Sequence, residues 1–316
     1  MSTTPSTPDA DHRYTIVGPP RGEEKPNGTG LLLLNRSSRL LRRDLIEELV
    51  DAGFREIVTV EPQENSYTVE SLSREFPALR FVLLHRPLSV GAQINLAMPL
   101  FAAERVLVQW STMAPPQGLE RAERHLRDHG DYCVAPVLRG EKGEPLPVLQ
   151  TPAMERRALR VLSLPLRADK APTLFPFDYV GLYHRERFVR LGGFDEAIAN
   201  AFWQKLDLGF RWYLFGGNSV VLSGFRMAYR SMPEPEDRTG DWGYARFFAK
   251  NLAVRVTDHG AQVPRLQVPA FALRSRLGIF HSIRVFSAAR RWVAAHRGRF
   301  LRDARTVVDD WSVEHV

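Results

Sequence analysis

Apolar runs and helical patterns alternate along residues 31–112, and this alternation constrains the fold more than any other feature of the chain. Four apolar runs are short enough to be buried strands, at 31–34, 57–60, 81–84 and 105–108. Three intervening segments carry apolar residues at helical spacing, at 39–52, 69–75 and 92–103. Strands that alternate with helices form a parallel sheet, and ligands bind beyond the carboxyl ends of its strands. We therefore predict an α/β fold with a mixed, mainly parallel sheet flanked by helices.

Polar residues stand where these predicted strands end. Asn35 follows the first strand, Glu61 ends the second, and Arg86 lies just beyond the third. Gly91 and Asn95 belong to the start of the next helix, whose free amide hydrogens suit a diphosphate. Taken alone, Glu61 is also an ordinary solvated acid at a strand end.

A second informative block spans residues 177–217. Gly192 and Gly193 can take a positive φ and form a turn, and Asp195 can cap a helix that begins at Glu196. Asp207 lies one helical turn before Arg211, so the two side chains can pair on one face. Gly216 can end that helix in the left-handed conformation.

This block resembles the acceptor side of family 2 glycosyltransferases. Gly192, Gly193, Phe194, Asp195 and Glu196 match the family's turn, and Asp207, Leu208 and Arg211 match the end of its pattern. The resemblance covers residues 30–255 and implies a Rossmann-like GT-A fold that binds a nucleotide diphosphate sugar. It places the nucleotide and sugar at Asn35, Glu61, Arg86, Gly91, Asn95, Trp110, Ser111, Thr112, Gly192 and Gly193.

The reactive carboxylates of that family are replaced in this chain. The acidic pair, whose second member takes the proton from the acceptor hydroxyl, falls on Gln204 and Lys205. Lys205 is a poor base, because an ammonium cannot accept a proton unless its pKa is strongly depressed. Trp110 and Thr112 occupy the positions of the metal-binding Asp-x-Asp, and an indole supplies no oxygen ligand to a hard cation.

The histidine that completes the metal site in many family members is also missing, since residues 220–229 contain none. We therefore predict no metal site and no cofactor. Fixed protein cations could still stabilise a diphosphate leaving group without an ion. The candidate cations are Arg86, Lys205, Arg226 and Arg230.

Three hypotheses about function follow. The first is a glycosyltransferase-like protein that binds a nucleotide sugar but lacks ordinary metal-dependent transfer. The second is an active, metal-independent glycosyltransferase of cell-envelope or other glycan assembly, with Asp207 or Asp195 near the acceptor. The third is a non-catalytic protein that docks a partner and keeps only a vestigial pocket.

Charge, cysteine content and hydropathy limit the classes of partner and the cellular compartment that we expect. The formal charge of +7 invites a nucleic-acid hypothesis, but no zinc-finger spacing, RNA-binding motif or helix-turn-helix signature is present, so we expect no nucleic acid. The single cysteine, Cys133, excludes an internal disulfide and is typical of a reducing compartment. With no apolar run of membrane-spanning length and no signal-peptide core, we expect a cytoplasmic protein.

The chain divides into a disordered leader at 1–28, a GT-A glycosyltransferase-like domain at 29–232 and a helical C-terminal extension at 233–316. Within these we predict helices at 154–161 and 242–257 and an exposed connector at 231–241. Residues 273–305 are basic and amphipathic. They can lie peripherally on an anionic membrane surface at its inner face, near a lipid-linked acceptor, or pack on the preceding domain with a solvated basic side.

Overall fold

The computed structural model describes residues 14–19, 28–36, 43–155, 158–264, 266–267, 269, 271 and 279–314. Its centre is a nine-stranded sheet in the order β1-β4-β3-β2-β5-β10-β6-β11-β9. The strands are β1 (Tyr14–Val17), β2 (Thr29–Leu34), β3 (Ile57–Pro62), β4 (Leu79–Leu84), β5 (Arg105–Trp110), β6 (Cys133–Arg139), β9 (Ala171–Pro172), β10 (Gly181–His184) and β11 (Ser219–Ala228).

The sheet is mixed and mainly parallel, as predicted. Strands β4, β3, β2 and β5 are parallel neighbours, and β11 is parallel to β6. The short β10 runs antiparallel to both β5 and β6, so those two strands point the same way. The carboxyl ends of β2, β3, β5, β6 and β11 therefore share one edge of the sheet.

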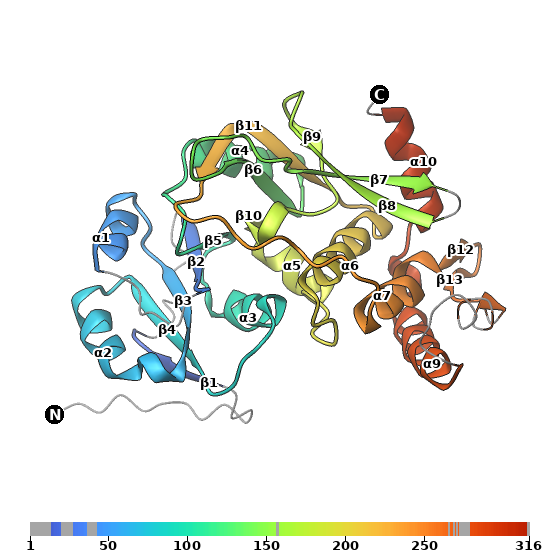
Figure 1. Ribbon diagram of the computed structural model, residues 1–316, viewed down its shortest axis with the longest axis horizontal. Helices are drawn as coiled ribbons and strands as arrows, with labels where there is room; N and C mark the ends of the chain where they lie inside the picture. The colour runs from blue at the N-terminus through green and yellow to red at the C-terminus, as the bar shows by residue number, and fades with distance from the viewer. Residues whose placement is uncertain are drawn as a thin grey trace.

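Helices cover the sheet and bury its apolar strands (Figure 1). Residues of β2 and β4 are buried along their whole length, which fits a sheet covered on both faces. The helices that follow the strands are α1 (Arg43–Asp51), α2 (Ser66–Glu75), α3 (Val90–Ala97), α4 (Leu119–His129), α5 (Arg185–Leu191) and α6 (Ala201–Leu214). The helix predicted at 92–103 is shorter, because Pro99 lies in a 3-10 turn, Met98–Leu100, that ends it.

The predicted helix at 154–161 is wrong. Strands β7 (Leu149–Glu155) and β8 (Ala158–Leu164) form an antiparallel hairpin there. Side chains of β8 alternate between exposed and half-buried, which is the period of a strand rather than of a helix. The hairpin reaches toward the C-terminal helix α10 (Ala304–Glu314).

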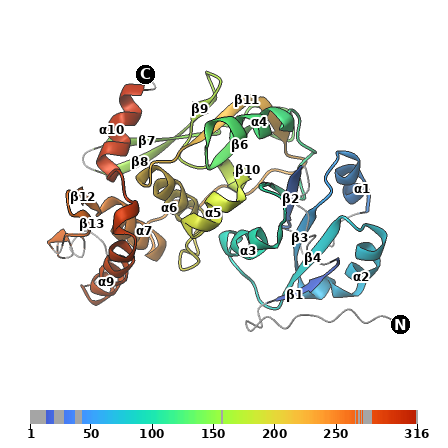
Figure 2. The same cartoon turned by 180° about the vertical axis from the view of Figure 1, so that it is seen from behind.

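The C-terminal part packs against α6 (Figures 1 and 2). Helix α7 (Trp242–Phe247) continues into a π-helical turn, Phe248–Leu252, so the predicted helix through residue 257 ends early. A small hairpin follows, β12 (Arg255–Thr257) and β13 (Gly260–Gln262), and then α9 (Ile279–Ala295). In the part of the chain that the structure describes, no helix has both the length and the apolar character to span a bilayer.

The predicted disordered leader and the predicted amphipathic C-terminal segment each differ in part from the structure. Residues 14–17, assigned to the leader, form β1, which pairs antiparallel with β4. Residues 1–13 and 20–27 lie outside the described residues. On α9, within the segment predicted to be amphipathic, Phe286 and Val293 are buried, whereas Ile279 and Ile283 are about half exposed.

Candidate functional site

The predicted strand-end residues Asn35, Glu61 and Ser111 lie together at the carboxyl edge of the sheet. Asn35 Nδ2 donates to Glu61 Oε2 over 2.9 Å, and Ser111 Oγ lies 3.4 Å from Asn35 Oδ1. Thr59 Oγ1 and Asn65 Nδ2 also donate to the Glu61 carboxylate, at 2.8 and 3.1 Å. We call Asn35, Thr59, Glu61, Asn65 and Ser111 the strand-end cluster. It offers amide and hydroxyl groups that can bond a base or a sugar.

Glu61 is an interior residue rather than a solvated acid, since its side chain is completely buried. Burial raises the pKa of its carboxyl, and the hydrogen bonds from Asn35, Thr59 and Asn65 offset part of that rise. The carboxylate therefore orients the neighbouring amides. Asn35 and Ser111, which are half-buried, form the side of the cluster that a ligand can reach.

A second group of side chains lies next to β5, and we call Arg36, Trp110, Asp178, Lys205 and Glu236 the central cluster. The Arg36 guanidinium lies 3.8 Å from the centre of the Trp110 ring and forms an ion pair with Asp178. Trp110 Nε1 donates to the Asp178 carbonyl over 3.0 Å. Tyr229, the residue after β11, donates its hydroxyl to the Asp178 carboxylate over 2.6 Å.

Lys205 forms the floor of the central cluster. Its side chain is 1% exposed, its ammonium lies 5.0 Å from the Tyr179 ring centre, and it forms an ion pair with Glu236. Burial lowers the pKa of Lys205 to about 7, Asp178 opposes this shift, and the positive charges of Arg36 and Arg238 add to it. The Glu236 carboxylate lies against the ammonium, and with a pKa of about 7 the amine is partly neutral near neutral pH.

The backbone of the central cluster is strained at Asp178 and Tyr179, which have φ of 53° and 66°. Residues with side chains rarely adopt this left-handed conformation, and each instance costs about 1–2 kcal/mol. Hydrogen bonds hold the pair in place, including Tyr183 Oη to the Tyr179 carbonyl at 2.9 Å and Tyr179 Oη to Gln204 Oε1 at 3.0 Å. Such strain is typical of a site whose side chains must point in defined directions.

Trp110 and Thr112, which the resemblance places at the Asp-x-Asp positions, do not fit a divalent metal. The Trp110 ring is covered by the Arg36 guanidinium, and the Thr112 hydroxyl is buried with no hydrogen-bond partner. Hard cations need anionic or carbonyl oxygens, and this pair supplies a single neutral hydroxyl. Within the described ranges, no group of three or more His, Cys, Asp or Glu side chains is arranged to hold a metal ion.

The other predicted ligand residues, Gly91, Asn95, Gly192 and Gly193, lie together at a separate place. Asn95 bonds both backbone groups of Phe194, donating to its carbonyl over 2.8 Å and accepting from its amide over 2.7 Å. Gly192 and Gly193 have φ of 88° and 60°, as predicted for the turn, and a Cβ at Gly193 would overlap Asn95. The Gly91 amide donates to Gln204 over 2.9 Å. These contacts fix α3 against α6.

Asp195 and Asp207 anchor the C-terminal part to α6. Asp207 is completely buried and accepts from Arg211 Nε at 2.8 Å, Asn251 Nδ2 at 2.8 Å and Lys250 Nζ at 3.2 Å. The predicted Asp207–Arg211 pair is therefore confirmed. Burial opposes ionisation of Asp195, but Lys250 and Arg246 outweigh it and hold the pKa of this carboxyl below its usual range.

The helix predicted to begin at Glu196 under an Asp195 cap is wrong. Helix α6 begins at Ala201, and the side chain of Asn200 caps it by accepting from the Trp203 amide over 3.1 Å. Asp195 instead accepts from the Ala197 amide within a turn. Because Asp195 and Asp207 are both engaged with buried cations, their role beside an acceptor stays a prediction.

The candidate cations are spread over several surfaces. Arg86 and Arg226 are exposed, and Arg230 is paired with Glu48 of α1 at 2.7 Å. The cations that approach Lys205 are Arg36 and Arg238, which the sequence did not single out. Arg36 directly follows the predicted ligand residue Asn35, and this adjacency was the available signal.

Comparison with known proteins identifies the fold. No protein-family model matches the chain, and no curated protein matches it by sequence. GalNAc-T7, solved with UDP, GalNAc and Mn2+, superposes with a TM-score of 0.52 at 11% identity, covering 71% of this chain and 48% of that one. Residues 1–349 of S. aureus TarS superpose with a TM-score of 0.45 at 15% identity, covering 82% of this chain and 69% of that one. The chain thus spans about half the length of GalNAc-T7, and it has a GT-A glycosyltransferase-like fold.

Proposed function

We propose that this protein is a family 2-like member of the GT-A fold that binds a nucleotide diphosphate sugar without catalysing ordinary metal-dependent transfer. The observation that carries the proposal is the Lys205–Glu236 pair, buried where the family has its catalytic base. In this ion pair Lys205 is in its ammonium form, which cannot take a proton from an acceptor hydroxyl.

The strand-end cluster supports the binding half of the proposal. Asn35 and Ser111 lie at the carboxyl ends of β2 and β5, where ligands of such sheets bind. The central cluster lies beside it, because Arg36 adjoins Asn35 and Trp110 adjoins Ser111. A nucleoside in the first cluster would therefore direct its diphosphate toward the cations Arg36 and Lys205.

The replacement of the expected metal ligands supports the proposal that the protein does not catalyse metal-dependent transfer. Transfer from a nucleotide diphosphate sugar needs stabilisation of the charge that develops on the leaving diphosphate. Trp110 and Thr112 offer no carboxylate to a cation that would provide it. The stacking of Arg36 on Trp110 fills the same place with a guanidinium.

One observation favours an active, metal-independent transferase as the second candidate. Glu236 is brought to the base position from a different segment, and its side chain is 20% exposed. With Arg36, Lys205 and Arg238 near the diphosphate, Glu236 could take the acceptor proton in place of the missing acid. Glu236→Gln would then abolish sugar transfer while leaving nucleotide binding intact.

Thermal shift assays with UDP, GDP, CDP and dTDP sugars, with and without Mn2+, test the proposal. A ligand that binds only the folded state at about 100 times its Kd stabilises it by about 2.7 kcal/mol. We expect stabilisation without added metal and no release or transfer of the sugar by chromatography. Sugar transfer would establish the second candidate, and no stabilisation by any of the four donors would overturn both.

A blocking variant locates the binding. Ser111→Phe fills the reachable side of the strand-end cluster and should reduce the shift. Ser287→Phe adds the same ring at an exposed position of α9 and should leave the shift unchanged. Equal shifts in the two variants would place the nucleotide elsewhere.

Contact with an anionic membrane through residues 273–305 is a further part of the proposal. Phe280 is 84% exposed on α9, beside the half-exposed Ile279 and Ile283 and the exposed Arg284. Exposed apolar side chains next to an arginine are typical of a surface that enters a lipid interface. Phe280→Ser should reduce sedimentation of the protein with vesicles of phosphatidylglycerol. Unchanged sedimentation would refute the proposed membrane contact.

A further inference from the structure

A pocket of about 610 Å³ opens on the edge of the sheet opposite the strand-end cluster. Tyr132 immediately precedes the first residue of β6, and Gly217 lies just before β11. Asn35 and Ser111, in contrast, follow the last residues of β2 and β5. Because these strands point the same way, the sheet separates this pocket from the strand-end cluster. We call it the arginine pocket, and it is lined by Gly130, Tyr132, Arg187, Arg190, Phe215, Gly216, Gly217 and Arg299.

The lining carries three arginines and no acid. Arg187 Nη1 donates to the Asp131 carbonyl over 3.1 Å, which fixes that guanidinium, and in the described part of the chain it pairs with no carboxylate. The Arg299 guanidinium lies 4.6 Å from the centre of the Phe215 ring. Among the described residues, Arg190 forms no ion pair or hydrogen bond through its guanidinium. Like charges held together in this way favour an anion between them.

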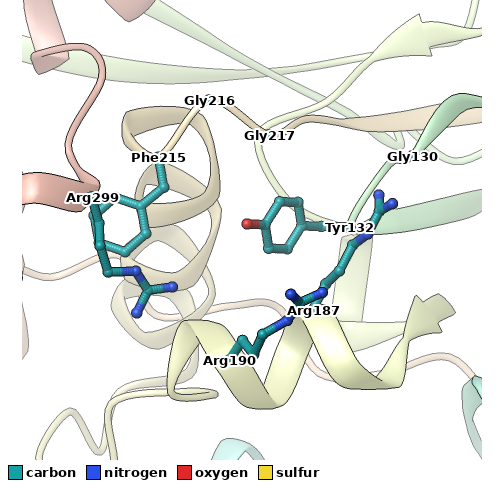
Figure 3. Close-up of a pocket in the computed structure, with 8 residues that line it drawn as sticks. All are labelled: Gly130, Tyr132, Arg187, Arg190, Phe215, Gly216, Gly217 and Arg299. Carbon is teal, nitrogen blue, oxygen red and sulfur yellow. The ribbon is translucent and has the colours of Figure 1, made fainter.

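Two aromatic rings form the side walls. Figure 3 shows Tyr132 pointing its hydroxyl toward Phe215 across the pocket, with Arg299 beside Phe215 and Arg190 extending from α5 toward Arg187. A side chain at Gly217 would overlap the Tyr132 ring, so this glycine permits the ring's position. Phe215 is backed by the Trp292 ring at 6.3 Å and the Phe300 ring at 4.9 Å. The walls are therefore packed in place before any ligand arrives.

A smaller hollow of about 300 Å³ shares Arg190 and Arg299 with the arginine pocket. Its lining also includes Arg211, Arg246 and Lys250 beside the acids Asp195 and Glu196. Asp195 forms ion pairs with Arg246 and Lys250, and Arg190 and Arg299 lie at the junction of the two pockets.

We propose that the arginine pocket binds a small molecule that carries a diphosphate and a ring. Guanidinium forks match the oxygens of phosphate and form charge-assisted hydrogen bonds with them. A planar or sugar ring fits between Tyr132 and Phe215, and the volume falls within the range of about 300–1,000 Å³ that small-molecule sites occupy. Arg299 belongs to the turn between α9 and α10, so the bound ligand joins the C-terminal part to α5.

Isothermal titration calorimetry with pyrophosphate, inorganic phosphate and UDP tests this proposal. We expect pyrophosphate to bind more tightly than phosphate, and UDP more tightly than pyrophosphate if the ring occupies the aromatic walls. Arg190→Ala should weaken pyrophosphate binding by about tenfold, as expected for the loss of one charge-assisted contact. Arg74→Ala removes an 81% exposed arginine from α2 and should have no effect.

Two further variants locate the anion. Arg299→Ala should weaken pyrophosphate binding as Arg190→Ala does, whereas Ser111→Phe should leave it unchanged because that residue lies on the other edge of the sheet. No binding of pyrophosphate, equal affinities of Arg190→Ala and Arg74→Ala, or loss of binding in Ser111→Phe alone would each overturn the proposal. Nucleotide-sugar binding at the strand-end cluster is measured separately, so the two sites can fail independently.

Discussion

Replacing Asp207 by asparagine is expected to destabilise the fold strongly, although the two side chains have the same shape. The carboxylate accepts from Arg211, Lys250 and Asn251, and all four side chains are buried. An amide keeps one oxygen but turns a donor toward a cation. The substitution thus leaves buried positive charge without its counterion.

The expected loss follows from the partners that remain. Removing one member of a buried ion pair costs about 3–5 kcal/mol, because the other charge stays desolvated. Arg211 still donates to the carbonyls of Leu191 and Gly193, and Lys250 still pairs with Asp195 at 2.8 Å. These contacts compensate in part, so we expect the lower end, about 3 kcal/mol.

The chain supplies a matched control for this measurement. Asp309 pairs with Arg305 at the same helical spacing, but the side chains are 64% and 80% exposed and lie 3.5 Å apart. Exposed pairs contribute about 0–1 kcal/mol, so Asp309→Asn should change stability little. Urea unfolding gives the free energy of unfolding of each variant, and the two values can be compared if the slope m against urea concentration is unchanged. A difference below about 1 kcal/mol would refute the assignment of Asp207 as a buried anchor.

Other substitutions test the turn and the central cluster. Gly193→Ala should lower the melting temperature more than Gly192→Ala, because both residues have positive φ but only the first would overlap Asn95. Lys205→Asp should destabilise the protein more than Lys205→Met in urea unfolding, because it sets a carboxylate beside Glu236. Burial lowers the pKa of Lys205 from 10.5 to about 7, so over that range the unfolded state binds more protons and stability should rise with pH. Glu236→Gln removes the carboxylate paired with the ammonium and should extend this rise to lower pH; a flat pH profile of the urea midpoint would contradict it.

Much of the fold could be predicted because burial leaves a local signature. Residues 31–34 and 81–84 are apolar without interruption, and both segments are strands covered on two faces. Parallel strands bring their carboxyl ends to one edge, so Asn35, Glu61 and Ser111 meet although the chain separates them. Periodicity failed at 154–161, where apolar residues are mixed with charged ones and the short pattern fits a strand as well as a helix.

The centre of the candidate site could not be predicted, because its pairs form across long stretches of chain. Arg36 and Asp178 are 142 residues apart, and Lys205 meets Glu236 from a connector with no apolar periodicity. A local sequence pattern indicates which residues share a helix or strand, but it does not indicate which distant loops come into contact. The roles of Asp195 were hidden for the same reason, since its partners Arg246 and Lys250 come from the C-terminal part.

The connector at 231–241 does more than join β11 to α7. Asn200 donates to the Asp237 carbonyl, Trp203 to the Thr239 carbonyl, and Arg238 to Ser163 of the β7–β8 hairpin, so the connector is tied down across α6. Glu236 of the connector lies against the Lys205 ammonium, so the position of the connector and the proton on Lys205 are linked reciprocally. Movement of the connector therefore changes the proton affinity of Lys205, and protonation of Lys205 shifts the position of the connector by the same free energy.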